Sequence, residues 1–205
     1  MVTASQTSLR ERKKSATKER IYRVALERFR EKGFAAATVE EVSAAAEVAK
    51  GTFFNYFPSK ESVLAYFGER QALLAAEAIA EAVADPGLTV RQKLERILSA
   101  LAAAVEEDPE LSRMALFEVL KVPTVIAADH HRAIFHILLV SLLREGQSSG
   151  EVRSELPPDD MAAAVEGAYF QQLFEWARSE PVNTLADRLL AMLNVLWLGM
   201  GKSRA

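Results

Sequence analysis

Apolar residues recur at spacings of three and four along almost the whole of this 205-residue chain, and this spacing limits the folds open to it. Between residues 17 and 32, for example, Tyr22, Ala25, Leu26 and Phe29 follow the i, i+3, i+4, i+7 pattern of one helix face. The alternation of apolar and polar residues that would indicate strands is nearly absent. The sequence therefore predicts an all-α protein.

Capping residues, glycines and prolines divide the chain into about nine expected helices. The first spans residues 17–32 and ends at Gly33, and a short second helix begins at Thr38. Its TVEE predicts a capping box, in which the Thr38 hydroxyl accepts the backbone N–H of Glu41 and the Glu41 carboxylate accepts that of Thr38. A third helix is expected over residues 50–57, and a long fourth begins near Lys60. Later breaks are expected at Asp85-Pro86-Gly87, Asp108-Pro109, Val122-Pro123, Gly146 to Gly150, Pro157-Pro158 and Glu180-Pro181.

The charge of the chain is unevenly distributed. Residues 1–60 carry 12 Lys and Arg against 7 Asp and Glu, a net charge of +5, whereas residues 61–205 carry 13 against 21, a net charge of −8. This asymmetry predicts a basic domain over residues 1–60 that meets a polyanion, and an acidic helical domain over residues 61–205. The alternative on charge alone is a basic disordered tail in front of an otherwise ordinary protein.

The stretch AKGTFFNYFPSKE, which begins at Ala49, indicates what the polyanion is. On a helix, Phe53 and Phe57 share one face and can pack on Val39 and Val42. The polar residues of the stretch then point outward. A helix this short is unstable alone, so its buried rings must hold it against the helices before it. Two short helices joined by a tight turn, the second presenting small polar residues beside lysines, predict a helix-turn-helix that binds DNA.

The residue types on the outward face suit duplex DNA. Lys50, Lys60 and the Tyr56 hydroxyl can contact phosphates, which fixes register without reading sequence. Thr52 and Asn55 are short enough to reach base edges, and Gly51 permits close backbone approach. A basic arm precedes the first helix and can follow the backbone or enter the minor groove; it comprises Arg10, Arg12, Lys13, Lys14 and Lys18.

Residues 17–67 resemble the N-terminal DNA-binding region of TetR-family transcriptional regulators. The resemblance rests on Ile21, Ala25, Phe29, Gly33 and Phe34, on Thr38-Val39, and on the run KGTFFNYFPSKE. It implies that residues 50–56 face the major groove and that Lys60 lies at a phosphate. The predicted DNA-binding residues are Thr38, Lys50, Gly51, Thr52, Phe54, Asn55, Tyr56 and Lys60.

Three residues depart from the usual family pattern. Glu47 stands where glycine is common, so the turn is strained if it needs a positive φ. Ala49 stands where serine or threonine often caps the third helix, and Phe54 stands where tyrosine is frequent. These departures leave the fold expectation intact but make the operator sequence hard to predict.

The resemblance implies a largely apolar effector cavity in the second domain. Its candidate lining residues, each of which is otherwise explained as core, are Phe67, Met114, Phe117, Phe135, Tyr169 and Phe174. The last helix is apolar on nearly every side, which favours burial on every side. A two-fold dimer through the last two helices would provide it, as in the family. The predicted interface residues are Met161, Val165, Ala168, Trp176, Leu189, Leu193 and Leu196.

These features predict a ligand-responsive transcriptional repressor that binds a palindromic operator as a homodimer. No phosphate loop, nucleophile elbow or metal-spaced cluster indicates an enzyme, a cofactor or a metal, and the spacing of His130, His131 and His136 fits one helix face poorly. An activator of the same family, or a ligand-binding protein or enzyme with a vestigial helix-turn-helix, is the alternative. The absence of cysteine, signal peptide and membrane span favours the cytoplasm.

Overall fold

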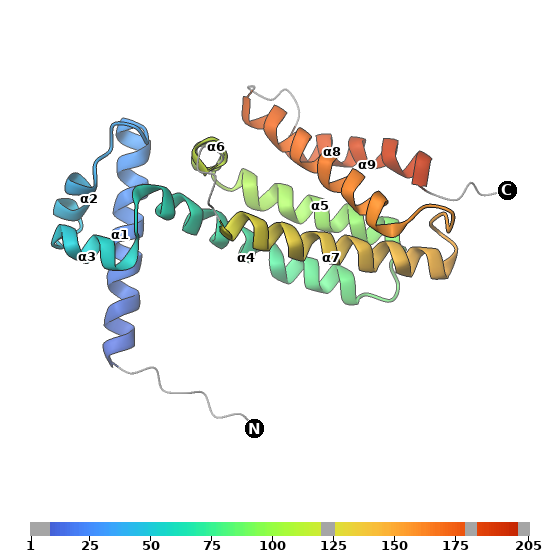
Figure 1. Cartoon of the computed structure of the whole chain (residues 1–205), viewed down its shortest axis with the longest axis horizontal. Coiled ribbons are helices and arrows are strands. Elements are labelled where there is room, and N and C mark those ends of the chain that lie inside the picture. The colour runs from blue at the N-terminus through green and yellow to red at the C-terminus, as the bar shows by residue number, and fades with distance from the viewer. Residues whose placement is uncertain (1–8, 120–125, 179–183, 201–205) are drawn as a thin grey trace. The chain divides into compact units, whose positions relative to one another are not determined.

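The computed structural model describes residues 9–119, 126–178 and 184–200, which form nine helices (Figure 1) and confirm the all-α prediction. The expected breaks at Val122-Pro123 and Glu180-Pro181 lie outside the described residues. The helices are α1 (Leu9–Lys32), α2 (Val39–Ala45), α3 (Lys50–Tyr56), α4 (Lys60–Ala84), α5 (Val90–Glu106), α6 (Pro109–Val119), α7 (Ile126–Ser149), α8 (Pro158–Arg178) and α9 (Leu185–Met200).

Two compact units make up the chain, and the division falls between Tyr66 and Phe67. Helix α4 is continuous across this division, so residues 60–66 belong to the first unit and residues 67–84 to the second. Each unit has its own buried apolar residues and is described by itself.

The first unit is built around the apolar face of α1. Ile21, Ala25 and Phe29 are buried there, as the helical spacing predicts, and the Phe29 ring lies 5.0 Å from that of Phe34. Helix α1 begins at Leu9, eight residues before the predicted start, so the basic arm is helical rather than extended. The extra residues, LRERKKSA, are mostly good helix formers and include no breaker, but they lack the apolar periodicity that marks a buried face.

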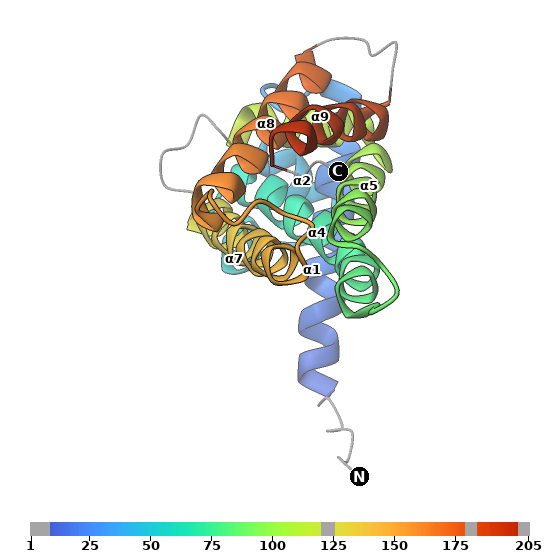
Figure 2. The ribbon, with the colours of Figure 1, turned by 90° about the vertical axis from the view of Figure 1, so that its right-hand side faces the viewer.

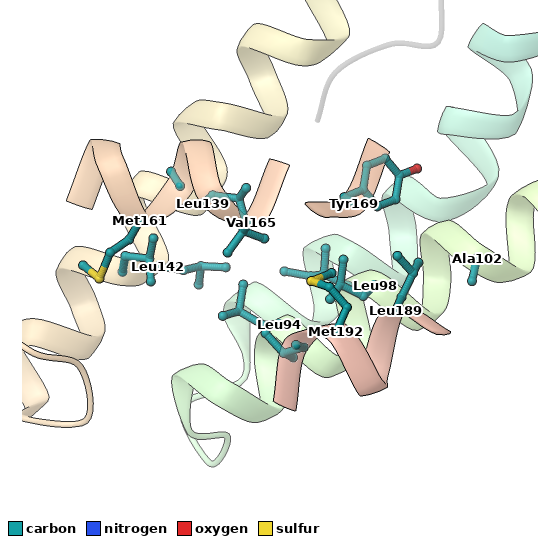
Figure 3. Packing of buried hydrophobic residues seen from close by; sticks show 14 of the residues in the cluster. Leu94, Leu98, Ala102, Leu139, Leu142, Met161, Val165, Tyr169, Leu189 and Met192 are labelled. Atoms are coloured by element: carbon teal, nitrogen blue, oxygen red, sulfur yellow. The ribbon is translucent and has the colours of Figure 1, made fainter. Parts of the chain in front are cut away.

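Side chains from α5, α7, α8 and α9 form most of the core of the second unit (Figure 3), to which Ala82 of α4 and Val152 also belong. Leu94 and Leu98 of α5, Leu139 of α7, Val165 of α8 and Leu189 of α9 meet in it, and all five are buried. Helices α8 and α9 lie side by side (Figure 2). Because each helix contributes one apolar stripe to this core, the opposite faces of α8 and α9 stay exposed.

The predicted break at Gly146 to Gly150 falls at its far end, because α7 continues to Ser149 and the chain turns at Gly150, whose φ is +79°. Gly146 serves packing instead. A Cβ at this position would lie 2.5 Å from Cγ2 of Val152, which is buried against the helix. The glycine thus allows the segment after α7 to return closely along it.

Candidate functional sites

The start of α2 carries the predicted capping box. The backbone N–H of Glu41 donates to the Thr38 hydroxyl at 3.2 Å, and the backbone N–H of Thr38 donates to the Glu41 carboxylate at 3.1 Å. The same carboxylate accepts a hydrogen bond from Nζ of Lys32 at 2.5 Å. The Lys32 contact, followed by the Thr38 backbone contact, lowers the pKa of Glu41 to about 2. Thr38 is therefore fixed at the N-terminus of α2, with its side chain exposed.

The turn between α2 and α3 places Glu47 in the left-handed region, with φ at +52°. Its N–H donates to the carbonyl of Ala44 at 3.1 Å, and the N–H of Val48 donates to that of Ser43 at 2.9 Å. Among the residues that the structure describes, Glu47 is the one residue other than glycine whose φ is positive. The strain expected from a residue other than glycine is present at this turn.

Two buried aromatic rings pack one face of helix α3 against the rest of the first unit. Phe53 and Phe57 are both almost completely buried, as their spacing predicts, and their ring centroids lie 6.0 Å apart. The Phe57 ring also lies 5.7 Å from the Tyr66 ring at the start of α4. Ala49 is the N-cap and makes no side-chain hydrogen bond, as expected. These contacts, rather than capping, hold this seven-residue helix in place.

The opposite face of α3 is open. Lys50, Gly51 and Asn55 are exposed, Phe54 is 44% exposed, and Thr52 and Tyr56 are half-buried. Nothing lies within 4 Å of the position that a Cβ on Gly51 would occupy. The Lys50 ammonium donates to the carboxylate of Glu40 on α2, and this hydrogen bond lowers the pKa of Glu40. Six of the eight predicted DNA-binding residues therefore lie on one short helix, mostly facing outward.

Lys60 differs from the other predicted phosphate contacts. Its ammonium donates to the backbone carbonyls of Phe34 at 2.8 Å, Ala35 at 3.2 Å and Ala37 at 3.3 Å. It also lies 4.5 Å from the centre of the Phe34 ring. The lysine is thus bound to the loop between α1 and α2, a contact that its position in the sequence did not indicate.

The basic residues of α1 are divided between two roles. Arg12, Lys13 and Lys14 are exposed, whereas Lys18 lies 3.7 Å from the centre of the Tyr66 ring. The side chain of Arg10 lies outside the described residues. A groove of about 560 Å³ between α1 and the end of α3 is lined by Glu11, Lys13, Lys14, Thr17 and Tyr56.

The candidate effector residues are dispersed over four helices of the second unit. Phe67 and Tyr169 are buried, whereas Met114, Phe135 and Phe174 are half-buried and Phe117 is 37% exposed. The Phe135 and Tyr169 rings lie 5.4 Å apart, and the Tyr169 ring lies 5.3 Å from that of Phe170. Burial raises the pKa of Tyr169 to about 12. An open groove of about 650 Å³ formed by α4, α5 and α9 includes none of the six candidates.

Most of the predicted interface residues face the core of their own unit. Met161, Val165, Trp176, Leu189 and Leu193 are buried there, and only Ala168 and Leu196 are partly accessible. The faces of α8 and α9 left exposed carry other small or apolar residues, among them Ala163, Ala164, Gly167, Ala191, Val195 and Leu198. The apolar character of α9 is thus used largely within its own unit, and the dimer interface stays a prediction.

A polar cluster links α7 to α8. His136 Nδ1 lies 3.3 Å from Oε1 of the buried Glu166, and its Nε2 lies 3.7 Å from Oδ1 of Asp159. The side chains of His130 and His131 lie outside the described residues. Within the part of the chain that the structure describes, no group of three or more His, Asp or Glu side chains could hold a metal ion. No helix there is long and apolar enough to cross a bilayer.

Two features of the candidate sites were not predicted from the sequence. Glu40 is ten residues from Lys50, and only its negative charge on the neighbouring short helix hinted at the pairing. The exposed stripe of α9 that holds Val195 and Leu198 could have been found by projecting the helix and noting two apolar faces rather than one.

The sequence of this chain is similar to those of known transcriptional regulators. Residues 21–67 match the model of bacterial regulatory proteins of the tetR family. The HTH-type transcriptional repressor DhaR of Mycobacterium sp. (strain GP1) is 27% identical over 167 residues, which cover 76% of this chain and 81% of DhaR.

Solved structures extend the likeness over both units. Thermus thermophilus FadR, a TetR-family transcriptional repressor solved in complex with lauroyl-CoA, superposes with a TM-score of 0.70 at 30% identity. The match covers 92% of this chain and 97% of FadR. SmeT, the repressor of the Stenotrophomonas maltophilia multidrug efflux pump SmeDEF, has the same fold with a TM-score of 0.72 at 20% identity, covering 91% of each chain.

Proposed function

Because this chain is a transcriptional regulator of the TetR family, we propose that it is a repressor that inserts α3 into the major groove of a DNA operator and is released by a small, largely apolar effector. The observation that carries the DNA part of the proposal is the two-sided character of α3. Phe53 and Phe57 are buried on one face of the helix, while Lys50 and Asn55 are exposed on the opposite face.

Each outward residue of α3 suits a different contact. Thr52 and Asn55 are the base-reading residues, because a short amide can pair with adenine and a threonine methyl can contact thymine. Lys50 and Tyr56 bind phosphates, together with Lys13 and Lys14 across the groove that they share with Tyr56. Phe54 offers an apolar surface to a sugar or a thymine methyl, and Thr38 stays a predicted contact at the start of α2.

The two proposed functions belong to the two parts of the chain that differ in net charge. Residues 1–60 bind DNA, and residues 61–205 bind the effector and form a homodimer in the cytoplasm. The interface consists of the exposed faces of α8 and α9, including Ala164, Gly167, Val195 and Leu198. Two-fold symmetry suits a palindromic operator, with half-sites spaced by about 34–36 Å or somewhat more.

The effector site lies within the second unit, near the aromatic pair Phe135 and Tyr169. Acyl-CoA compounds are the first ligands to test, because the FadR relative is a complex with lauroyl-CoA. Effector binding favours a conformation that fits the operator poorly, and so shifts the population away from DNA. Helix α4 transmits this change to the DNA-binding unit, since it runs from Lys60 into the effector-binding unit.

The proposal is tested by selecting genomic fragments on the purified protein, followed by fluorescence anisotropy on the recovered site at several salt concentrations. We expect tight binding to a palindrome with a steep salt dependence, and release by an acyl-CoA or another apolar ligand. Weak binding without sequence preference, in protein freed of bound small molecules, would contradict the proposed function. Ligands that bind the second unit without changing operator affinity would contradict the effector mechanism.

A further inference from the structure

Helices α7 and α8 pack along one another, and three aromatic rings lie at the seam between them. The Phe135 ring of α7 lies 5.4 Å from the Tyr169 ring of α8, which in turn lies 5.3 Å from the Phe170 ring. Burial raises the pKa of Tyr169 to about 12, so its hydroxyl is neutral at neutral pH. This aromatic cluster therefore offers π faces, which attract cations, and carries no charge of its own.

Glu166 brings a buried carboxylate to the same seam. It is 4% exposed, and it shares one face of α8 with Tyr169 and Phe170, which follow it by three and four residues. Its Oε1 lies 3.3 Å from Nδ1 of His136, the residue after Phe135 on α7. An ionised carboxylate is costly to bury unless positive charge accompanies it. The imidazole supplies that charge only when it is protonated.

The charged groups along the seam add to this negative character. Oδ1 of the exposed Asp159 lies 3.7 Å from Nε2 of His136, and its Oδ2 lies 3.6 Å from the guanidinium of Arg144. The two carboxylates, of Asp159 and Glu166, thus face one guanidinium, and these three groups have a net charge of −1 when the imidazole is neutral. The seam therefore favours a ligand that carries positive charge.

The outer edge of the seam is accessible from solvent. The His136 side chain is 34% exposed, and Phe135 and Phe170 are half-buried. Glu166 and Tyr169 are buried. A ligand entering from solvent can therefore contact the two half-buried rings and bring a positive group towards the carboxylate.

We propose that the effector is a lipophilic organic cation, such as an amine or a quaternary ammonium or phosphonium compound, bound with its charge against Glu166 and its apolar body on the aromatic cluster. This inference rests on the proposed function, and it narrows the apolar effector proposed there to one sign of charge. Acyl-CoA compounds, whose phosphates are anionic, become the comparison ligands of opposite charge.

Two ions of matched shape and opposite charge test the inference. Tetraphenylphosphonium and tetraphenylborate carry the same four rings, so the ratio of their affinities isolates the effect of charge. We expect calorimetric titration of the purified protein, without DNA, to show the phosphonium bound about tenfold more tightly than the borate. Glu166→Gln keeps the shape of the side chain without its charge, and should reduce this ratio to about threefold or less.

Glu175→Gln is the matched control. It removes the same charge from an exposed position of α8, where the Glu175 carboxylate accepts a hydrogen bond from Gln171 at 3.2 Å. This variant should keep the wild-type affinity ratio. Phe135→Leu should weaken phosphonium binding about threefold more than borate binding, because it removes one π face. A variant that fails to fold would lose both ions alike.

Tighter binding of the borate to wild type, or a preference for the phosphonium that Glu166→Gln retains, would overturn the inference. Fluorescence anisotropy on the operator duplex separates this failure from failure of the proposed function. Release of DNA by lauroyl-CoA but not by the phosphonium would overturn the cation site and leave the proposed repressor intact. A Glu166-dependent preference for the phosphonium without any change in operator affinity would support the site and contradict the proposed effector mechanism.

Discussion

Lys50, the first residue of α3, donates a hydrogen bond to the carboxylate of Glu40 on α2. The contact lowers the pKa of Glu40, so the carboxylate is charged at neutral pH. Both side chains are more than half exposed. Lys50, which we propose to bind a phosphate, is therefore already paired with an anion of its own chain, so in this proposal DNA competes with Glu40 for its ammonium.

Replacing Glu40 by glutamine should tighten binding to all DNA sequences by about two- to fivefold, because an exposed ion pair is weak but must be broken on binding. Fluorescence anisotropy on an operator duplex and on a random duplex would measure the change. Glu27→Gln is the matched control, since it alters net charge equally but removes a pair with Arg23 on α1. Weaker binding by Glu40→Gln alone would indicate that Glu40 aligns Lys50 or contacts a base.

Glu47→Gly should stabilise the first unit by about 0.5–1 kcal/mol. The left-handed backbone at φ +52° costs a side-chain-bearing residue about 1–2 kcal/mol, and the greater freedom of glycine in the unfolded chain offsets part of the gain. A urea titration followed by tyrosine absorbance suits this unit, because it holds Tyr22, Tyr56 and Tyr66 of the four tyrosines. Glu47→Ala removes the charge without relieving the strain, so equal stability of the two variants would exclude a backbone effect.

The pH dependence of stability should report the capping box of α2. The folded-state pKa of Glu41 is about 2, below its ordinary value of 4.5, so its charge stabilises the fold above about pH 4.5 and this contribution is lost as the pH falls through about 2. The difference in unfolding free energy between wild type and Glu41→Gln should therefore shrink as the solution is acidified. In a Lys32→Met background the same difference should be smaller and less dependent on pH. A difference that is constant down to pH 2 would contradict this assignment.

Mutation of Leu193 should change the stability of the fold, whereas mutation of Leu198 should change the oligomeric state, although both residues lie on α9. Leu193 is fully buried, so Leu193→Ala should cost about 2–5 kcal/mol of unfolding free energy in urea titrations. Leu198 is 82% exposed, so Leu198→Asp should leave the helices intact by circular dichroism but give monomers in sedimentation. Leu73→Asp, at an exposed residue of α4, is the control that should stay dimeric. A dimeric Leu198→Asp variant would place the interface elsewhere.

The spacing of residues along the sequence was sufficient to predict contacts between residues three or four positions apart. The capping box of Thr38 and Glu41 and the shared face of Phe53 and Phe57 follow from spacings of three and four residues. For Glu47 the sequence predicted strain on the condition that the turn needs a positive φ, and the φ of +52° meets that condition. These features predict the start of α2 and the buried face of α3, whereas the packing of Phe57 on Tyr66 of α4 adds a contact that local spacing does not give.

Contacts between distant residues could not be predicted in this way. Lys60 meets carbonyls more than twenty residues earlier, and nothing in its neighbourhood distinguishes them from a phosphate as acceptors. The buried face of α9 posed a similar problem, because Leu193 and Leu198 are equally apolar and only the packing of α5 and α8 decides which is covered. The early start of α1 was missed because a solvated helix carries no apolar pattern.

The central claim, that α3 reads base sequence, is tested most directly by Asn55→Ala on a set of operators that each differ at one base pair. We predict that the variant loses discrimination at one position of each half-site, by about 1–3 kcal/mol, and keeps it at the others. Equal weakening on every operator, with the pattern of discrimination intact, would contradict the claim and show that Asn55 only supports the contact with the DNA backbone.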